Sequence, residues 1–277
     1  MTVLDCGGRT LDLGRCRVMG ILNVTPDSFS DGGDFFCLDD ALAQARAMVD
    51  AGAAVIDIGG ESTRPGAPAV SAEEEIHRVV PVIEAVHAEL SVPISIDTSK
   101  PLVMQAAVAA GAGLINDVRA LQEEGALEAA AALAVPVCLM HMQGEPRTMQ
   151  QAPSYDDVVA EVTAFLMQRV RVCEQAGITR QRLLIDPGFG FGKDLNHNLM
   201  LMQQLETLVA TGLPVLTGVS RKSMIGNILV NKVDQRLFGG LALAALAAWQ
   251  GSVLIRTHDV GATVDAISVI DAVLKAG

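Results

Sequence analysis

The chain has 277 residues, of which 50% are hydrophobic, 19% are charged and only 3% are aromatic. This length allows one α/β barrel or two small domains, and the scarcity of aromatic residues means that aliphatic side chains fill the core, as they do inside a barrel. The 20 basic and 32 acidic residues give a net charge of −12. Such a charge argues against nucleic-acid partners and anionic membrane surfaces, because both require a basic patch.

The five cysteines are odd in number and have no metal-ligand spacing such as Cys-x-x-Cys. We therefore expect reduced thiols in a cytoplasmic protein. Charged residues interrupt the first segment of the chain, so it does not read as a signal peptide, and no apolar run is long enough to span a membrane.

Residues 3–17 contain two short segments on either side of Gly7 and Gly8, a pattern typical of a small β-hairpin. Because this hairpin precedes the first core strand, we expect it to close the bottom of a barrel.

A repeating unit follows, in which a short apolar run precedes an amphipathic segment. The predicted strands are 18–23, 54–59, 93–97, 114–118, 136–141, 183–186, 214–219 and 253–258. The predicted helices are 38–51, 72–90, 100–110, 125–134, 155–176, 198–211, 236–250 and 261–275. This alternation predicts an α/β fold, the (β/α)8 TIM barrel, because a doubly wound sheet of five or six strands would leave two units over. No linker divides the chain, so residues 1–277 are expected to form a single domain.

The predicted strands end in polar residues that can bind a ligand or catalyse a reaction. In a barrel these ends converge on one mouth, where the active sites of the fold lie. We therefore predict one composite site. Its candidate residues are Asn23, Thr63, Arg64, Asp97, Asn116, His141, Asp186, Lys222, Arg256 and His258.

One group of these residues suits an anion. Arginines bind phosphate through paired hydrogen bonds, so Arg64 and Arg256, with His258, Asn23 and the Thr63 hydroxyl, form a candidate site for phosphate or pyrophosphate.

A second group comprises Asp97, Asn116 and Asp186. A planar heterocycle with adjacent N–H donors, such as a 2-amino-4-oxo-pyrimidine, would pair with these carboxylates, which are costly to bury alone. The alternative for Asp97 and Asp186 is a buried salt bridge or a helix cap. Asn23 can add an oxygen ligand for Mg²⁺, although one Asn does not by itself specify a metal site.

Two further segments resemble ligand-binding motifs: the first does not match its motif, and the second has two interpretations. The segment 188–193, GFGFGK, looks like a phosphate-binding loop, but the P-loop pattern requires Gly at Pro187 and Ser or Thr at Asp194. His141 is either a soft metal ligand, with Met140 and Met142 beside it, or the end of a strand whose Met140 lines the pocket.

Eight segments resemble, in order, the sequence blocks of the bacterial dihydropteroate synthase family: MGILNVTPDSFSDGG, DIGGESTRPGA, SIDTSK, INDVRAL, LMHMQG, LLIDPGFGFGK, GVSRKSMIG and IRTHDV. The resemblance runs from about residue 3 to residue 275. It implies a (β/α)8 barrel that joins 6-hydroxymethyl-7,8-dihydropterin pyrophosphate to p-aminobenzoate and releases pyrophosphate. It also implies a homodimer formed through the last helices.

The resemblance further implies the following roles. Asn23 would ligate Mg²⁺. The pterin would be bound by Asp97, Asn116, Asp186 and Lys222, with Met140 lining its pocket. The pyrophosphate would be bound by Thr63, Arg64, Arg256 and His258. The p-aminobenzoate pocket would be framed by Pro65, Phe191 and Ser223, with Phe29 and Asp31 closing over it. The residues implied to act in catalysis are Lys222, Asp97, Asp186 and Asp31.

The implied mechanism is dissociative. Mg²⁺ and the cationic cluster would stabilise the departing pyrophosphate, the dihydropterin would stabilise a methylene cation, and the arylamine would then attack.

Two alternatives differ in testable ways. A methyltetrahydrofolate methyltransferase acting on a corrinoid would keep the pterin-binding residues but would not need Arg64, Arg256, His258 and the SRKS segment. A catalytically inactive barrel that serves as a binding protein would bind no pterin at all.

Overall fold

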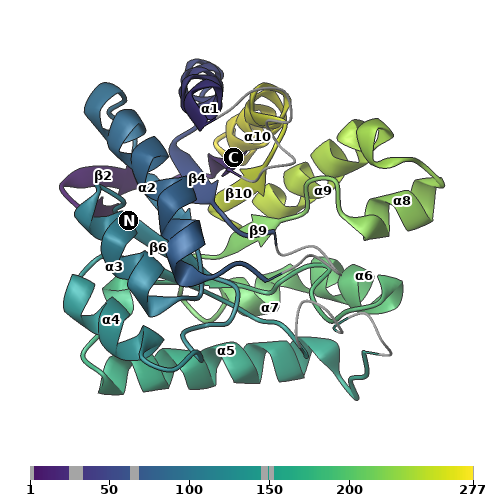
Figure 1. Ribbon diagram of the computed structural model, residues 1–277. Helices are drawn as coiled ribbons and strands as arrows, with labels where there is room; N and C mark the ends of the chain where they lie inside the picture. Colours follow the sequence, from purple (N-terminus) through teal and green to yellow (C-terminus); the bar gives the residue numbers. More distant parts are fainter. Residues whose placement is uncertain (1–2, 25–33, 63–68, 145–148, 150–152, 277) are drawn as a thin grey trace.

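Figure 1 shows the computed structural model of the chain, which describes residues 3–24, 34–62, 69–144, 149 and 153–276. An eight-stranded parallel sheet forms the centre, and helices surround it. Within the described residues, no helix is both long and apolar enough to cross a membrane.

The strands of the barrel run parallel in the order β8-β7-β6-β5-β4-β3-β10-β9. They are β3 (Arg17–Asn23), β4 (Val55–Gly59), β5 (Ile94–Asp97), β6 (Leu114–Asp117), β7 (Val137–Met140), β8 (Leu183–Asp186), β9 (Leu216–Gly218) and β10 (Leu254–Thr257). A bridge between Ile185 and Val215 joins the two ends of this order and closes the barrel. The predicted TIM barrel is thus confirmed, and β10 lies beside β3 in the register Arg256 to Met19.

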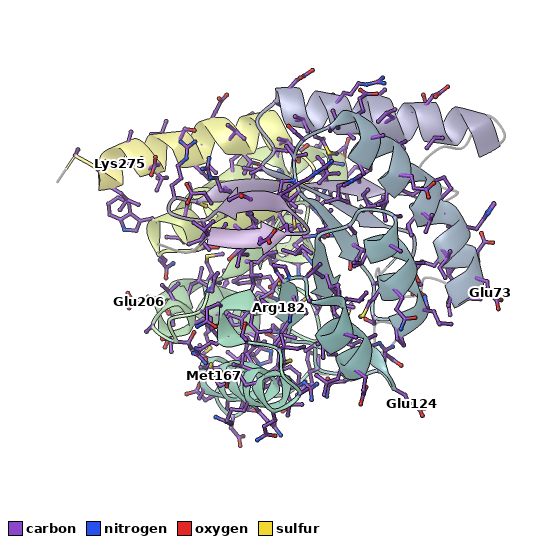
Figure 2. All side chains as sticks on the ribbon, turned by 90° about the vertical axis from the view of Figure 1, so that its left-hand side faces the viewer. Glu73, Glu124, Met167, Arg182, Glu206 and Lys275 are labelled. Atoms are coloured by element: carbon purple, nitrogen blue, oxygen red, sulfur yellow. The ribbon has the colours of Figure 1, made fainter. Side chains whose placement is uncertain are left out.

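The hairpin closes the bottom of the barrel, as predicted. Strands β1 (Val3–Cys6) and β2 (Arg9–Asp12) pair in antiparallel fashion around the two glycines. Their inward side chains pack on the inward side chains at the amino ends of the barrel strands, and Figure 2 shows the hairpin in front of that end. The contact is close at Gly113, where a Cβ atom would lie 2.1 Å from the carbonyl oxygen of Cys6, so only glycine fits.

The helices follow the predicted alternation. They are α1 (Asp34–Asp50), α2 (Ala72–Glu89), α3 (Pro101–Ala109), α4 (Ala126–Leu133), α5 (Val158–Gln175), α6 (Leu195–Gln203), α7 (Leu205–Val209), α8 (Ser223–Leu229), α9 (Leu237–Trp249) and α10 (Val260–Leu274).

The structure differs from the predicted helices in three places. The helix predicted over 198–211 is interrupted at Gln204, which has φ −114° and ψ 28° and separates α6 from α7. It also begins earlier, at Leu195, because Asp194 caps it through a capping box with His197. Helix α8 was not predicted, since it is short and contains Gly226, and α1 begins at Asp34 rather than at Leu38.

Alternation along the strands separates two sets of side chains. The isoleucines of β4 and β5, such as Ile56 and Ile94, belong to the core between sheet and helices. The residues between them point into the barrel, and the register places Asp57 beside Ser95 and Asp97 beside Asn116. The barrel interior is therefore apolar near the hairpin and polar near the carboxyl ends of the strands.

Candidate active site

The polar interior is centred on the guanidinium of Arg256, from β10. Its Nε donates to Oδ2 of Asp57 at 2.6 Å, and its Nη2 donates to Oδ2 of Asp97 at 2.7 Å. Burial opposes the charge of Arg256, but the two carboxylates outweigh it and raise the pKa of Arg256, so the guanidinium stays charged. Nδ2 of Asn116 donates to the same Oδ2 of Asp57 at 3.2 Å. One carboxylate thus contacts residues from β6 and β10.

Asp57 is a residue that the sequence reasoning missed. It is fully buried in the middle of β4, between Ile56 and Ile58. A signal was present, because a carboxylate inside a strand buried on both faces is costly unless it has a charged partner.

The structure changes the predicted grouping of the polar residues. Arg256 was assigned to an anion site separate from Asp97, but the two residues form an ion pair. That grouping overlooked the position of both side chains inside the barrel. The alternative considered for Asp97, a buried salt bridge, is the arrangement that the structure contains.

The two candidate carboxylates at the ends of β5 and β8 have raised pKa values. Burial raises the pKa of Asp97 to about 7, although Arg256 opposes this effect. Burial also raises the pKa of Asp186 to about 6, against the backbone N–H of Gly188, which donates to its Oδ1 at 2.7 Å, and against Lys222. Carboxylates with strongly shifted pKa values in one cleft are typical of functional sites.

Lys222 follows β9 and lies next to Phe191. Its Nζ is 4.1 Å from the centroid of the Phe191 ring, within the range of a cation–π interaction. Burial lowers the pKa of Lys222 to about 8, against the attraction of Asp186. The structure therefore places Lys222 near both Asp186 and Phe191.

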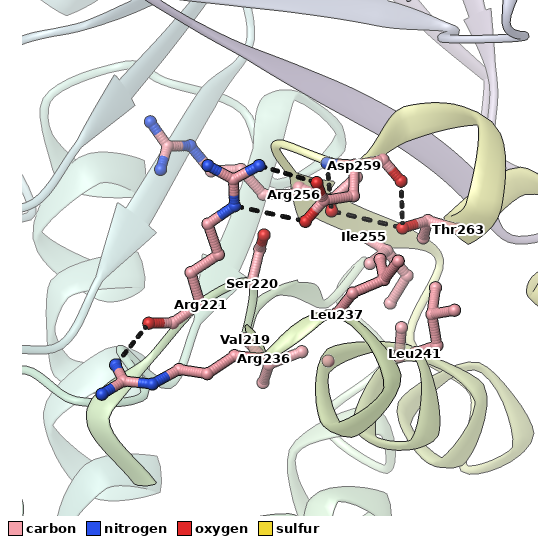
Figure 3. Close-up of a pocket in the computed structure, with 13 residues that line it drawn as sticks. Val219, Ser220, Arg221, Arg236, Leu237, Leu241, Ile255, Arg256, Asp259 and Thr263 are labelled. Carbon is pink, nitrogen blue, oxygen red and sulfur yellow. Dashed lines mark hydrogen bonds and ion pairs between the residues drawn. The ribbon is translucent and has the colours of Figure 1, made fainter. Parts of the chain in front are cut away.

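Polar contacts fasten the segment after β9 to the segment after β10. Arg221 pairs with Asp259 (Nη2 to Oδ1, 2.7 Å), and its carbonyl oxygen accepts from Nη1 of Arg236 at 3.0 Å (Figure 3). Oγ of Ser220 lies 3.0 Å from Nδ1 of His258. These contacts hold His258 beside the segment that carries Lys222 and Ser223. Arg221 itself has φ 58°, a left-handed conformation that costs about 1 kcal/mol or more for a non-glycine residue.

Asn23 ends β3 at the mouth, paired in register with Gly59 and partly exposed. Within the described ranges, no three His, Cys, Asp or Glu side chains are placed to share a metal ion. A single neutral amide oxygen suits a hard cation that takes its remaining ligands from substrate phosphates and water, which is a common way for Mg²⁺ to bind.

His141 directly follows β7, at the end of the strand. Its Nδ1 lies 2.9 Å from Nζ of Lys193. Burial and this cation lower the pKa of His141 to about 3, so the ring is neutral. Met140 is buried beside Phe191 in a small apolar cluster that also includes Val118 and Met149. The remaining predicted site residues, Phe29, Asp31, Thr63, Arg64 and Pro65, lie outside the described residues.

Comparisons with known proteins agree with this geometry. Residues 19–258 match the family described as pterin binding enzyme. The chain is 56% identical over 269 residues to the dihydropteroate synthase of Escherichia coli K12, covering 97% of this chain and 95% of that protein. A solved structure of Xanthomonas albilineans dihydropteroate synthase with 4-aminobenzoic acid superposes with a TM-score of 0.94, at 55% identity and 99% coverage of both chains. A second structure of that enzyme, in complex with 7,8-dihydropteroate, superposes with a TM-score of 0.90, at 53% identity and 98% coverage of both chains.

Proposed function

The chain belongs to the pterin binding enzymes, among the bacterial dihydropteroate synthases, and from this premise we propose how its barrel mouth binds the two substrates and the metal. The reaction joins 6-hydroxymethyl-7,8-dihydropterin pyrophosphate to p-aminobenzoate and yields 7,8-dihydropteroate and pyrophosphate.

The pterin binds inside the mouth, against Asp97, Asn116, Asp186 and Lys222, with Met140 lining its pocket. The carboxylates accept hydrogen bonds from the N–H groups of the 2-amino-4-oxo ring, and the Lys222 ammonium donates to the ring. Support comes from the convergence of these side chains from four neighbouring segments and from the raised pKa values of both carboxylates. A bound heterocycle would supply the hydrogen bonds that the buried carboxylates lack from water.

The pyrophosphate binds to Arg256 and His258 and to Thr63 and Arg64 of the segment after β4. The guanidinium of Arg256 donates to Asp97, one of the pterin-binding carboxylates, and Asp57 fixes its orientation through Nε. As the bond to the pterin methylene breaks, Arg256 stabilises the negative charge that develops on the leaving group.

Asn23 would hold Mg²⁺ through its amide oxygen. A bound ion would supply Lewis-acid chemistry that neutralises charge on the departing pyrophosphate. The donor set fits an ion that arrives with the pyrophosphate, since Asn23 is one neutral ligand at the open end of β3.

The p-aminobenzoate binds between Phe191, Ser223 and Pro65, with Phe29 and Asp31 closing over it. The ring of Phe191 and the amino end of α8 then set the direction from which the amine attacks the methylene cation. We assign to Asp31 and its segment the role of excluding water from the methylene cation.

We also infer a homodimer through the last helices. The large apolar side chains exposed there include Phe238, which is 80% exposed, and Val269, which is 63% exposed. Large apolar side chains exposed on these two packed helices suit an interface between two copies of the chain. Phe238→Asp should convert a dimer to a monomer in light scattering after size-exclusion chromatography.

One observation carries the proposal: Asn116 and Arg256 both donate to one buried carboxylate, Asp57, and Arg256 also donates to Asp97. The experiment is pyrophosphate release from the dihydropterin pyrophosphate, with and without p-aminobenzoate, in Mg²⁺ and in chelator. Release that requires Mg²⁺ and yields dihydropteroate supports the assignment. Bound pterin without release would favour the methyltransferase alternative, and no pterin binding would favour an inactive barrel.

A further inference from the structure

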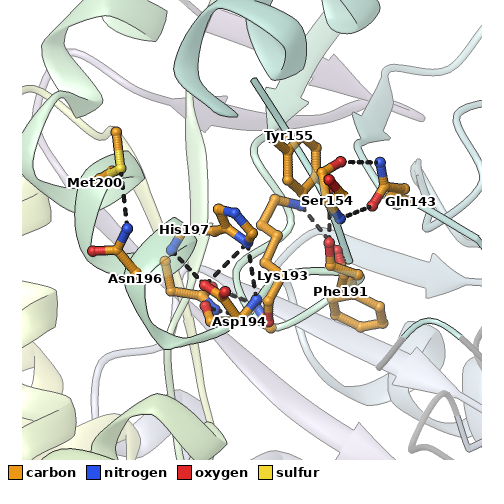
Figure 4. Close-up of polar contacts among 12 residues, drawn as sticks. Gln143, Ser154, Tyr155, Phe191, Lys193, Asp194, Asn196, His197 and Met200 are labelled. Atoms are coloured by element: carbon orange, nitrogen blue, oxygen red, sulfur yellow. Dashed lines mark hydrogen bonds and ion pairs between the residues drawn. The ribbon is translucent and has the colours of Figure 1, made fainter. Parts of the chain in front are cut away.

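The GFGFGK segment, which failed as a phosphate-binding motif, is built around the side chain of its lysine. Lys193 is 2% exposed, one of the largest fully buried side chains. Its Nζ donates to the carbonyl oxygen of Phe191 at 3.0 Å (Figure 4). It also donates to the carbonyl oxygen of Gly188 at 3.0 Å and lies 2.9 Å from Nδ1 of His141. An ammonium group has three N–H donors, so these three acceptors use all of them. Lys193 is therefore engaged by the protein itself and does not bind a phosphate.

Burial makes a positive charge on Lys193 energetically costly. Among the described residues, no carboxylate contacts Nζ, and burial lowers the pKa of Lys193 to about 7, against the attraction of Asp186. A buried cation held by neutral acceptors alone costs more than an apolar side chain of the same size would. His141 contributes a neutral ring nitrogen, and its own backbone oxygen lies 3.4 Å from Nζ. Stability alone does not account for a charged side chain at this position.

The backbone around Lys193 needs an anchor. Gly188, Gly190 and Gly192 have φ values of 67°, 79° and 61°. A Cβ atom at Gly188 would lie 1.9 Å from the carbonyl oxygen of His141, and one at Gly192 would lie 2.2 Å from that of Gln143, so the segment is pressed against the end of β7. Three glycines lose much conformational entropy when they are ordered. The hydrogen bonds of Lys193, together with those that Asn198 makes to Gly190 and Tyr155 makes to Gly192, offset that cost.

The hydrogen bonds of Lys193 fix the backbone of Phe191. Its carbonyl oxygen accepts from Lys193, and its backbone N–H donates to the carbonyl oxygen of Gly188, which also accepts from Lys193. Its ring, on the other side, faces Nζ of Lys222 at 4.1 Å. The backbone of Phe191 is thus fixed at both of its polar atoms by groups bound to one buried ammonium.

We propose that Lys193 is a positioning residue for the arylamine substrate, which acts by fixing the backbone of Phe191 so that its ring forms one wall of the p-aminobenzoate pocket. This inference rests on the proposed role of Phe191. Two of the residues proposed to bind the pterin, Asp97 and Asn116, lie on β5 and β6, and Lys193 hydrogen-bonds to neither strand. Asp186 and Lys222 do contact this segment, through the N–H of Gly188 and the ring of Phe191. The effect of Lys193 should therefore be much larger on the arylamine than on the pterin.

The test is steady-state kinetics with both substrates varied, on the full chain. Lys193→Met keeps an unbranched apolar stem, one atom shorter, and removes the three donors. We expect the KM for p-aminobenzoate to rise at least tenfold, and the KM for the pterin pyrophosphate to stay within threefold. Leu208→Ala, a cavity in the distant helix α7, is the matched control for lost stability and should change neither KM. Equal shifts of both KM values in Lys193→Met, or none, would overturn the inference.

A double-mutant cycle tests whether Lys193 changes the KM for p-aminobenzoate through Phe191. In a Phe191→Ala background, whose KM for p-aminobenzoate is already raised, Lys193→Met should raise that KM by less than twofold more. Full additivity would show that Lys193 does not act through Phe191.

If Lys193→Met does not fold, a second variant tests the same segment. Tyr155→Phe removes only the hydrogen bond to Gly192 and should raise the KM for p-aminobenzoate two- to fivefold. No change in that KM would overturn the inference. A wild-type chain that forms no dihydropteroate would instead refute the proposed function.

Discussion

Asp57 and Arg256 lie 199 positions apart in the chain, yet Nε of the arginine donates to Oδ2 of the aspartate at 2.6 Å. The pair spans from β4 to β10, across β3. The same carboxylate oxygen accepts from Asn116. Asp57 therefore holds one residue proposed to bind the pterin and one proposed to bind the pyrophosphate, without reaching the mouth itself.

Asp57→Asn should reduce kcat/KM for the pterin pyrophosphate at least tenfold. The amide keeps an oxygen for Arg256 and Asn116 but removes the charge that orients the guanidinium. Weakening a hydrogen bond between charged groups should lower the free energy of unfolding by about 1–3 kcal/mol, as measured by urea denaturation. Glu89→Gln, which breaks an ion pair with Arg46 on the surface, is the control and should leave both quantities nearly unchanged. Wild-type kinetics in Asp57→Asn would show that Asp57 is only a structural partner.

Lys222→Ala should abolish turnover while leaving the fold intact. Removing a hydrogen-bond donor to the transition state typically costs about a hundredfold or more in kcat. The ammonium is buried at a free-energy cost, as its lowered pKa indicates, so its loss should barely change the thermal midpoint. A destabilisation like that of a large-to-small core substitution, about 2–5 kcal/mol, would mark Lys222 as structural instead.

Pterin affinity should rise with pH between about 5 and 8. Asp97 and Asp186 must be ionised to accept the ring N–H groups, and their pKa values are raised to about 7 and about 6. Below these values each carboxyl holds a proton that must be lost before binding. Titration calorimetry with a pterin that is neutral over this range measures the effect. Asp186→Asn should lose the lower of the two steps, and a flat profile in the wild type would contradict the assignment.

The same shift predicts a stability gain in Asp186→Asn. The pKa of Asp186 is about 6 in the folded protein and about 4 when unfolded, so the folded state binds more protons between these values. The free energy of unfolding therefore falls as pH rises from about 4 to about 6, and stays lower above it. At pH 8 the amide variant, which cannot ionise, should be more stable by roughly 1–3 kcal/mol. At pH 4 the two proteins should unfold at similar urea concentrations.

Asn23→Ala should raise the Mg²⁺ concentration needed for half-maximal pyrophosphate release by about tenfold, the scale expected for loss of one ligand that carries no charge. Binding of a pterin without the pyrophosphate group should be unchanged, which separates a metal role from a general defect of the mouth. Equal Mg²⁺ dependence in both proteins would remove Asn23 from the metal site.

The periodic features of the sequence were sufficient to predict the barrel and its hairpin, because burial on both faces makes each strand a continuous apolar run. The break at Gln204 was not predictable, since no Gly or Pro marks it and tertiary packing decides it. Helix α8 is too short for a periodic signal.

The sequence identified single polar residues at the ends of single strands. It did not show which of these residues form ion pairs or hydrogen bonds with one another. Asp97 and Arg256 were each identified, but their ion pair joins strands that are remote in sequence. Lys193 was judged against phosphate motifs, whereas its actual partners are backbone carbonyls, which leave no trace in side-chain spacing.

Closure of the barrel by β3 against β10 has a consequence for synthesis on the ribosome. The first core strand is made near residue 20, but its neighbour emerges only after residue 254 has been translated. Until then β3 presents an unpaired edge, which invites association with other nascent chains. A chain that terminates before β10 would also lack Arg256, so incomplete products should be both aggregation-prone and unable to catalyse the reaction.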